Sequence, residues 1–289
     1  MESSSSVSVI IPARDEGASI GEVVSRVRQQ VPDAEILVVD DGSSDQTARL
    51  ASDAGATVIS HPRALGNGAA VKRGAREAGG DILVFLDGDG QHDPADIPRL
   101  LERLEAGFDM VVGARASARS HANTGRLIAN GIYNLVASIV TGHPIPDLTS
   151  GFRAARADKF CKFLYLLPNG FSYPTTITMA FMRSGYPVEF IDIQAAKRSG
   201  KSHIRPVRDG IRFLMIIFKI ATLYAPLKLF LPASTMFFLT GIGYYAYTFV
   251  SQGRFTNMTL LLLSAAVIIF LIGLISEQIT ALNYKDSGR

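Results

Sequence analysis

Short apolar runs and helical repeats alternate along the first part of the chain. Apolar runs, many of them β-branched, predict strands at residues 7–11, 35–39, 58–60, 82–86 and 110–113. Apolar positions at helical spacing predict helices between these strands, at residues 19–31, 47–54, 69–77 and 94–105. Strands and helices that alternate in this way are typical of an α/β fold, in which a mostly parallel sheet forms the middle of three layers.

The pattern becomes amphipathic beyond this region. Residues 123–141 predict a helix with a polar side and a broad apolar arc. That arc suits packing against the α/β domain or burial in a membrane interface, and the sequence that follows favours the interface. Residues 206–224 predict a second amphipathic helix, with Arg208, Arg212 and Lys219 aligned on one face. Such a helix suits a surface of anionic lipid.

Two long apolar stretches end the chain. Residues 229–250 and 258–275 carry no charge, and each is long enough to span a bilayer. The short segment 251–257 connects them as a turn. A buried helical hairpin in a soluble protein is the alternative, but the domain ahead of it already contains enough apolar sequence for its own core. We therefore expect a transmembrane hairpin.

Basic residues predict the orientation of this hairpin. Lys228, Lys285 and Arg289 flank the two ends, whereas the turn carries only Arg254. By the positive-inside rule both ends are cytoplasmic, which locates the protein in the cytoplasmic membrane with the α/β domain facing the cytoplasm. The predicted segments are a disordered N-terminus at 1–6, the α/β domain at 7–205, a juxtamembrane helix at 206–225, the hairpin at 229–276 and a cytoplasmic tail at 277–289.

Composition narrows the possible partners. The net charge of +3 is mild and the basic residues are spread along the chain, so nucleic acid is not an expected partner. A single cysteine, Cys161, excludes an intramolecular disulfide framework, and no Cys and His residues stand at zinc-binding spacing. The N-terminal segment is Ser-rich and lacks the basic and apolar regions of a cleavable signal peptide.

Acidic residues follow two of the predicted strands. Asp40 and Asp41 end the second, and Asp87, Asp89 and Gln91 follow the fourth. Parallel strands bring such residues to one edge of the sheet, where a nucleotide fits between them. Two carboxylates and an amide oxygen suit a hard divalent cation that keeps positions free for phosphate oxygens. A plain polar turn is the alternative for the Asp-x-Asp pair taken alone. Dinucleotide-binding and P-loop motifs are both missing from the sequence.

Three motifs taken together resemble family 2 glycosyltransferases, most closely the dolichol-phosphate mannose synthase branch. They are VIIPARDE at 9–16, VDDGSSDQT at 39–47 and DGDGQH at 87–92. The resemblance covers about three quarters of the chain, and the ordered set is more specific than any single motif. It implies a GT-A fold, a Rossmann-like domain that binds a nucleotide-sugar.

The resemblance also implies roles for the acidic edge. Donor-binding residues would be Pro12, Arg14, Glu16, Asp41 and Asp87, with Glu16 and Asp41 facing the nucleoside. Asp87, Asp89 and Gln91 would hold Mg²⁺ or Mn²⁺ on the diphosphate. Pro12 serves equally well as a simple turn former.

Further motifs imply an acceptor side. The stretch 147–153 resembles the family's Ser-Gly-Phe motif, and 198–203 resembles its Arg-x-Gly-x-Ser-Lys loop, with His203 where Lys is usual. Arg offers a bidentate fork to phosphate and Lys a point charge. The residues expected to bind an acceptor phosphate are Arg115, Arg126, Ser150, Arg198 and Lys201. We expect Asp89, Arg115 and Arg126 to be catalytic.

A donor site beside a cationic pocket on a membrane-bound domain indicates a lipid acceptor, namely a polyprenyl phosphate. The expected reaction transfers a sugar from a UDP- or GDP-sugar, with inversion. Two alternatives stay open: a membrane polysaccharide synthase, whose Gln-x-x-Arg-Trp motif is impossible in a chain without Trp, and a non-catalytic nucleotide-sugar binding module. The sugar and the choice between undecaprenyl and dolichyl carriers are undetermined. Gly241 and Gly243 permit close helix packing, so a homo-oligomer is a further possible partner.

Overall fold

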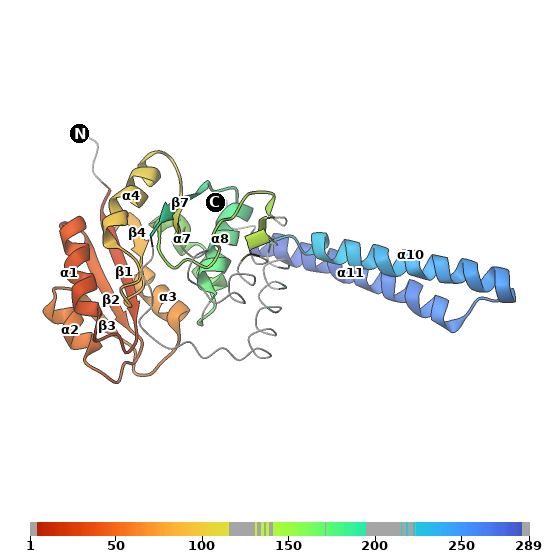
Figure 1. Ribbon diagram of the computed structural model, residues 1–289, viewed down its shortest axis with the longest axis horizontal. Helices are drawn as coiled ribbons and strands as arrows, with labels where there is room; N and C mark the ends of the chain where they lie inside the picture. The colour runs from red at the N-terminus through yellow and green to blue at the C-terminus, as the bar shows by residue number, and fades with distance from the viewer. Residues whose placement is uncertain are drawn as a thin grey trace.

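The computed structural model contains a mixed α/β sheet and a long helical hairpin (Figure 1). It describes residues 5–115, 131, 134–135, 137–138, 141–170, 172–194, 215, 218, 222 and 224–284. The strands are β1 (Val7–Ala13), β2 (Glu35–Asp40), β3 (Thr57–Ser60), β4 (Ile82–Phe85), β5 (Met110–Arg115), β6 (Arg153–Arg156) and β7 (Val188–Ile193). Within the described residues they form one sheet in the order β3-β2-β1-β4-β6-β5-β7.

Helices cover both faces of this sheet, as the sequence predicts. The described helices of the α/β domain are α1 (Ile20–Gln30), α2 (Thr47–Asp53), α3 (Asn67–Glu77), η1 (Pro94–Asp96), α4 (Ile97–Glu105), α7 (Ala157–Cys161), η2 (Leu164–Leu166) and α8 (Tyr173–Arg183). The first four predicted strands and all four predicted helices are confirmed within a few residues, and β5 extends the fifth strand to Arg115.

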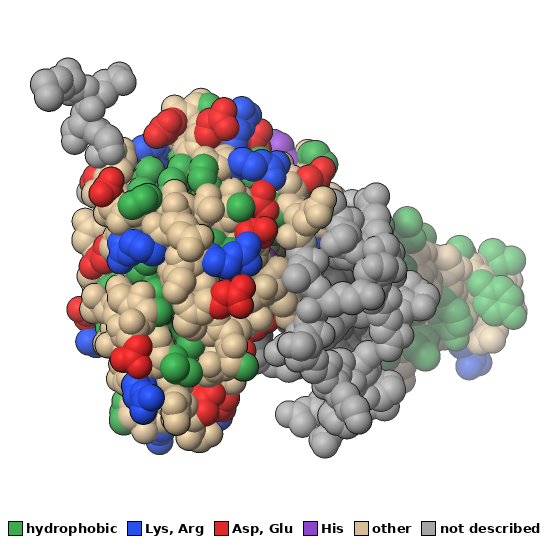
Figure 2. All heavy atoms as spheres, turned by 60° about the vertical axis from the view of Figure 1, so that its left-hand side comes forward, with side chains coloured by type: hydrophobic (Ala, Val, Ile, Leu, Met, Phe, Trp, Pro, Cys, Tyr) green, Lys and Arg blue, Asp and Glu red, His purple; other side chains and the backbone are tan. Residues whose placement is uncertain are grey.

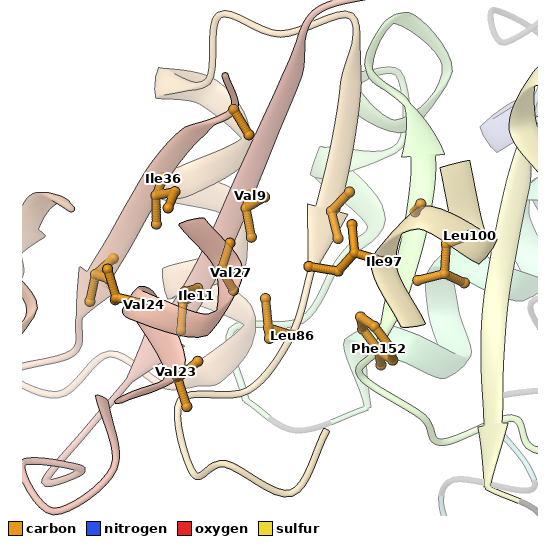
Figure 3. Close-up of a cluster of buried hydrophobic side chains, with 14 of the residues drawn as sticks. Val9, Ile11, Val23, Val24, Val27, Ile36, Leu86, Ile97, Leu100 and Phe152 are labelled. Atoms are coloured by element: carbon orange, nitrogen blue, oxygen red, sulfur yellow. The ribbon is translucent and has the colours of Figure 1, made fainter. Parts of the chain in front are cut away.

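Alternate residues of each strand enter separate cores. In β1, Val9 and Ile11 join the cluster beneath α1, α2 and α4, whereas Ile10 points to the opposite cluster beneath α3, α7 and α8. This follows from the two-residue period of a strand. Figure 3 shows the first cluster, where Val23 and Val27 of α1 meet Leu86 and the β1 side chains. A sheet buried on both faces leaves its carboxyl edge as the place where polar loops gather.

Strand β6 departs from the predicted parallel pattern. It pairs antiparallel with both β4 and β5, with Phe85 and Val112 each opposite Arg153. Its sequence, Arg-Ala-Ala-Arg, lacks the apolar run that marks the other strands. Because β6 runs backwards, the loop that precedes it lies at the carboxyl edge of β4 and β5. The remaining strand, β7, was also not predicted; it pairs parallel to β5.

The C-terminal hairpin consists of α10 (Pro226–Gln252) and α11 (Asn257–Tyr284). Both are long and apolar enough to cross a membrane: within the spans 226–252 and 257–282, stretches of 18 residues have mean hydropathies of 1.3 and 2.9. They project from the α/β domain in Figure 1, and Figure 2 shows a largely hydrophobic hairpin surface beside a domain face of mixed charge. The structure therefore confirms an apolar helical hairpin, longer at both ends than predicted.

Three predicted boundaries change or lie outside the described residues. Ser6, expected in a disordered segment, donates from its backbone N–H to Asp81 Oδ2 at 3.0 Å. Helix α11 continues through 277–284, which we expected to begin the tail. Of the predicted amphipathic helices, only scattered residues are described: Ala137 is buried against the domain core and Leu135 is exposed.

Phe160 tests the packing of α7 on the sheet. Its ring is fully buried and stacks on Phe85 with centroids 4.6 Å apart. Phe160→Ala is expected to lower the free energy of unfolding of the domain by about 3–5 kcal/mol, because it leaves a cavity. Tyr165→Ala, at a side chain that is 63% exposed, should change it by less than about 0.5 kcal/mol. Denaturant unfolding followed by near-ultraviolet circular dichroism measures both, and equal effects would contradict the described packing.

Candidate active site

Three loops meet at the carboxyl edge of the sheet. Strands β2, β1 and β4 are adjacent and parallel, with Ala13 opposite Asp40. The Asp41 N–H donates to Ala13 O at 2.9 Å, and the Gly88 N–H donates to Pro12 O at 3.4 Å. The loops after all three strands are therefore fixed side by side, as the sequence predicts from the strand directions.

Hydrogen bonds in both directions connect the first and second loops. The Ser44 N–H donates to Asp15 Oδ1 at 2.8 Å, and the Gly17 N–H donates to Asp45 Oδ2 at 2.9 Å. Asp15 adopts a left-handed conformation with φ of 53°. The Glu16 N–H donates to Thr47 Oγ1 at 2.9 Å, which fixes the backbone of a predicted donor residue.

The other predicted donor residues of the first loop differ in exposure. Pro12 is buried at the end of β1, in a position that suits a structural role. The side chain of Arg14 is 58% exposed and lies 3.7 Å from Asp15. Arg14 is thus open to a ligand at this edge. Pro12 contributes mainly through its backbone carbonyl, which accepts the hydrogen bond from the Gly88 N–H.

Asp41 is buried and extensively hydrogen-bonded. Its Oδ1 accepts from the Leu65 N–H at 2.8 Å and lies 2.8 Å from His61 Nδ1, and its Oδ2 accepts from the Gly66 N–H at 2.7 Å. Burial raises the pKa of this carboxyl, but the hydrogen bonds from His61 and the two amides outweigh burial and lower it. Since a carboxylate oxygen has two lone pairs, Oδ2 can accept a further donor.

Asp87 and Asp89 lie in the loop after β4, with Gln91 beside them. The Gln91 amide donates from Nε2 to Asp89 Oδ2 at 2.7 Å, and its backbone N–H donates to Oδ1 at 3.1 Å. Burial raises the pKa of Asp87, the nearby Asp89 carboxylate raises it further, and His92, Asn67 and Arg115 oppose the shift. The structure thus brings together the three predicted metal ligands, in a place where negative charge is costly.

Unsatisfied polar atoms also gather around Asp87. Among the described residues, the buried side-chain atoms without a hydrogen-bond partner are Asn67 Oδ1, His92 Nδ1, Ser150 Oγ and Arg153 Nε. His92 Nδ1 is 3.9 Å from Asp87 Oδ2, and Asn67 hydrogen-bonds to Asp87. Buried polar atoms are usually hydrogen-bonded, so these four atoms are candidates to bind a ligand, an ion or water.

The acidic loop suits a hard divalent cation. Asp87 and Asp89 offer carboxylate oxygens, and Gln91 offers an amide oxygen if its side chain turns over. Within the described part of the chain, no group of three or more His, Cys, Asp or Glu side chains is placed to hold a metal. The donor set thus fits a cation that takes its remaining ligands from a diphosphate and water.

Arg115 ends β5 on the other side of Asp87. Its Nε donates to Asp147 Oδ2 at 2.7 Å, and its Nη2 donates to Asp147 Oδ1 at 3.0 Å and to Thr149 Oγ1 at 2.7 Å. Burial raises the pKa of Asp147, but these bonds from Arg115 outweigh it and lower the pKa. The guanidinium is therefore fixed by a bidentate ion pair that the sequence did not predict.

The turn before β6 joins the two sides of the site. An added Cβ at Gly151 would lie 2.9 Å from Asp87 Oδ2, so the turn passes too close to the carboxylate to leave room for a side chain. The Phe152 ring stacks on His92 with centroids 5.3 Å apart. Ser150, a predicted acceptor residue, is fully buried in this turn. Antiparallel β6 thus completes the site by bringing residues 147–152 to the same edge as Asp87.

Arg153 stabilises the turn before β6 and was not predicted from the sequence as a site residue. It is fully buried, and its guanidinium donates to Ser150 O, to Pro174 O at 3.1 Å and to Thr178 Oγ1 at 3.0 Å. No described carboxylate forms an ion pair with it. A buried charge held by neutral groups is unusual. The motif contained Arg153, but its burial depends on the antiparallel strand.

Three predicted residues lie outside the described part of the chain. They are Arg126, Arg198 and Lys201, and the unusual His203 lies there too. Their roles stay predictions. Of the predicted acceptor cluster, the structure therefore places Arg115 and Ser150.

Two family models match the chain. The model "Glycosyl transferase family 2" matches residues 8–163, and "GtrB C-terminal hairpin" matches residues 225–282. The first spans the acidic edge and β6, and the second spans α10 and most of α11. Together they account for both parts of the structure.

Curated relatives with named activities are similar over much of their length. Glycosyltransferase AglJ of Haloferax volcanii is 29% identical over 100% of this chain and 98% of its own. Undecaprenyl-phosphate mannosyltransferase of Micrococcus luteus is 32% identical over 67% of this chain and 88% of its own. Polyprenol monophosphomannose synthase of Mycolicibacterium smegmatis is 30% identical over 66% of this chain and 77% of its own.

Solved structures support the fold. Glucosyl-3-phosphoglycerate synthase from Mycobacterium tuberculosis, in complex with phosphoglyceric acid, superposes with a TM-score of 0.61 at 24% identity, covering 75% of this chain and 79% of that one. Another structure of that synthase contains Mn²⁺ and UDP-glucose. The α/β domain thus has the GT-A-like fold. By its family model and its relatives, the chain belongs to glycosyl transferase family 2 and is related to the polyprenyl-phosphate sugar transferases.

Proposed function

We propose that this glycosyltransferase moves a sugar from a UDP- or GDP-sugar to a polyprenyl phosphate, with inversion at the anomeric carbon. The observation that carries the proposal is the acidic loop of Asp87 and Asp89 lying beside the fixed Arg115, on a domain joined to an apolar hairpin. The names of the relatives, which include an undecaprenyl-phosphate mannosyltransferase, support a polyprenyl phosphate acceptor.

The donor would lie along the carboxyl edge of β2, β1 and β4. Asp41, whose lowered pKa keeps it ionised, would accept a hydrogen bond from the nucleoside, with Glu16 and Arg14 beside it. Asp87, Asp89 and Gln91 would hold Mg²⁺ or Mn²⁺, which when bound neutralises charge on the departing diphosphate. A donor held in this way would have its anomeric carbon on the Arg115 side of the edge.

The acceptor would enter from the Arg115 side. Its phosphate monoester has a second pKa of about 6, so it is largely dianionic at neutral pH and needs no protein base. A phosphate oxygen forms the new bond to the anomeric carbon as the bond from that carbon to the diphosphate oxygen breaks. Among the described residues, Arg115 Nη1 has no acceptor, because Nε and Nη2 face Asp147 and Thr149. Arg115 would therefore align the phosphate through Nη1 and offset the repulsion between two anions.

The hairpin supports a reaction at a membrane. Both helices are long enough to span, and basic residues at their ends favour a cytoplasmic domain. Nucleotide-sugars are made in the cytoplasm, and the phosphate of a polyprenyl lipid lies at the membrane surface. The proposed location is thus the cytoplasmic membrane, with the active site on the cytoplasmic side.

A donor panel tests the proposal. Purified protein, polyprenyl phosphate and Mn²⁺ or Mg²⁺ are incubated with radiolabelled UDP- and GDP-sugars, and the organic phase is counted. We expect label from one donor to enter the lipid phase and EDTA to prevent the transfer. Donor binding without any label in lipid, across the whole panel, would exclude a polyprenyl phosphate acceptor.

Asp89→Asn separates metal binding from folding. The change keeps the side-chain shape but removes a charge from the proposed metal site, so kcat is expected to fall by about 10²–10³-fold. The melting temperature should stay within a few degrees of the wild type. Asp53→Asn, at a side chain that is 65% exposed on α2, is the matched control and should retain full activity. Full activity of Asp89→Asn would contradict the metal assignment.

Arg115→Lys tests whether the Arg115 guanidinium binds the acceptor phosphate. Lys cannot donate to Asp147 bidentately and to a phosphate together, so kcat/KM for polyprenyl phosphate is expected to fall by about 10²-fold. The Kd for the nucleoside diphosphate, measured by calorimetry, should change by less than twofold. Arg49→Lys, whose side chain is 71% exposed, serves as the control. An equal loss of donor affinity would assign Arg115 to the donor side instead.

A further inference from the structure

Each membrane-spanning helix carries a single Lys, Arg, Asp or Glu residue. In α10 it is Lys228, in the first turn, and in α11 it is Glu277, seven residues before the helix end at Tyr284. An acidic residue in an otherwise apolar spanning helix is costly and usually marks a functional contact. The partners of Glu277 therefore indicate what that contact is.

Glu277 connects three helices through its two oxygens. Its Oε1 accepts from Arg183 Nη2, at the end of α8, at 3.0 Å, and its Oε2 accepts from the Leu227 N–H, in the first turn of α10, at 3.3 Å. The side chains of Arg183 and Glu277 are only 20% and 29% exposed. A partly buried, charge-assisted pair of this kind fixes geometry better than a surface pair. One carboxylate thus links both hairpin helices to the catalytic domain.

Neighbouring contacts reinforce the same junction. The Arg183 guanidinium lies over the Tyr224 ring, 5.9 Å from its centroid, and the Tyr224 hydroxyl donates to Thr141 O at 3.5 Å. One turn beyond Glu277, Thr280 Oγ1 donates to Thr222 O at 3.0 Å. The base of the hairpin is therefore held at several points around the ion pair.

A small apolar cluster continues from this junction to the acceptor side of the site. Its buried members include Leu148, Met179 of α8 and Ala225 directly before α10, and Leu229 packs against them. Leu148 lies in sequence between Asp147 and Thr149, and both of these neighbours hydrogen-bond to Arg115. The apolar cluster thus connects the hairpin base to Leu148, and the sequence neighbours of Leu148 hold the Arg115 guanidinium.

We propose that Glu277 is a positioning residue: paired with Arg183, it fixes the catalytic domain on the hairpin so that Arg115 meets the phosphate of an acceptor embedded in the membrane. This inference rests on the proposed function. It predicts that loss of the ion pair lowers kcat/KM when the phosphate of the acceptor is held at the bilayer surface. A short acceptor that diffuses in water reaches Arg115 from any orientation of the domain.

The test compares two acceptors on the full chain reconstituted in vesicles of phosphatidylethanolamine and phosphatidylglycerol. One acceptor is undecaprenyl phosphate in the same vesicles, and the other is a water-soluble, ten-carbon prenyl phosphate. For Glu277→Gln we expect kcat/KM to fall by about tenfold with the vesicle acceptor. With the soluble acceptor, and for the KM of the donor, we expect less than a twofold change. Glu105→Gln, an exposed Glu on α4, is the matched control.

Charge exchange provides the second variant. Arg183→Glu combined with Glu277→Arg restores an ion pair of reversed polarity, so it should recover most of the vesicle activity that Arg183→Glu alone loses. If Glu277→Gln does not fold, the comparison of this double variant with Arg183→Glu decides the question. No recovery would overturn the proposal.

The remaining outcomes are distinct. An equal loss with both acceptors would assign the pair a general structural role, and no loss with either would remove any role; both results overturn the proposal and leave the proposed function intact. A wild-type protein that transfers sugar to neither acceptor would overturn the proposed function, and this inference with it.

Discussion

The close approach of Gly151 to the Asp87 carboxylate joins the two halves of the candidate active site. Asp87 follows β4 and belongs to the edge that suits a nucleotide-sugar, whereas Gly151 belongs to the turn that leads into β6. A side chain at position 151 would displace the carboxylate. The turn is held by its own carbonyls: Ser150 O accepts from Arg153, Gly151 O from the Tyr173 hydroxyl and Phe152 O from the Gly113 N–H. The acidic loop and the arginine side therefore depend on one antiparallel strand.

This arrangement explains why part of the site was predictable from sequence. Asp41 and Asp87 follow strands whose apolar runs are clear, and parallel strands necessarily bring their carboxyl ends to one edge. Arg115 was predicted as a phosphate ligand, and the structure places it beside that edge. Its pairing with Asp147 was not predicted, because the two residues meet only when β6 lies between β4 and β5.

The parts that were missed have physical reasons. Strand β6 has Arg at both ends and only two alanines between them, so its hydrophobic pattern does not predict a strand. Arg153 is fully buried although Arg is usually exposed, and two of its hydrogen-bond acceptors, Pro174 O and Thr178 Oγ1, lie in α8 and are distant in sequence. Strand β7, with the sequence Val-Glu-Phe-Ile-Asp-Ile, is rich in apolar and β-branched residues, a signal that was available. The hairpin was clear, since length and composition alone mark spanning helices.

A structure of the full chain in a lipid bilayer with Mn²⁺, a nucleoside diphosphate and polyprenyl phosphate tests the central claim most directly. The account predicts Mn²⁺ on Asp87 and Asp89, the diphosphate on that ion, and the lipid phosphate on Arg115 with its chain directed toward the base of the hairpin. A lipid phosphate bound away from Arg115, or a diphosphate bound away from the two carboxylates, would contradict it.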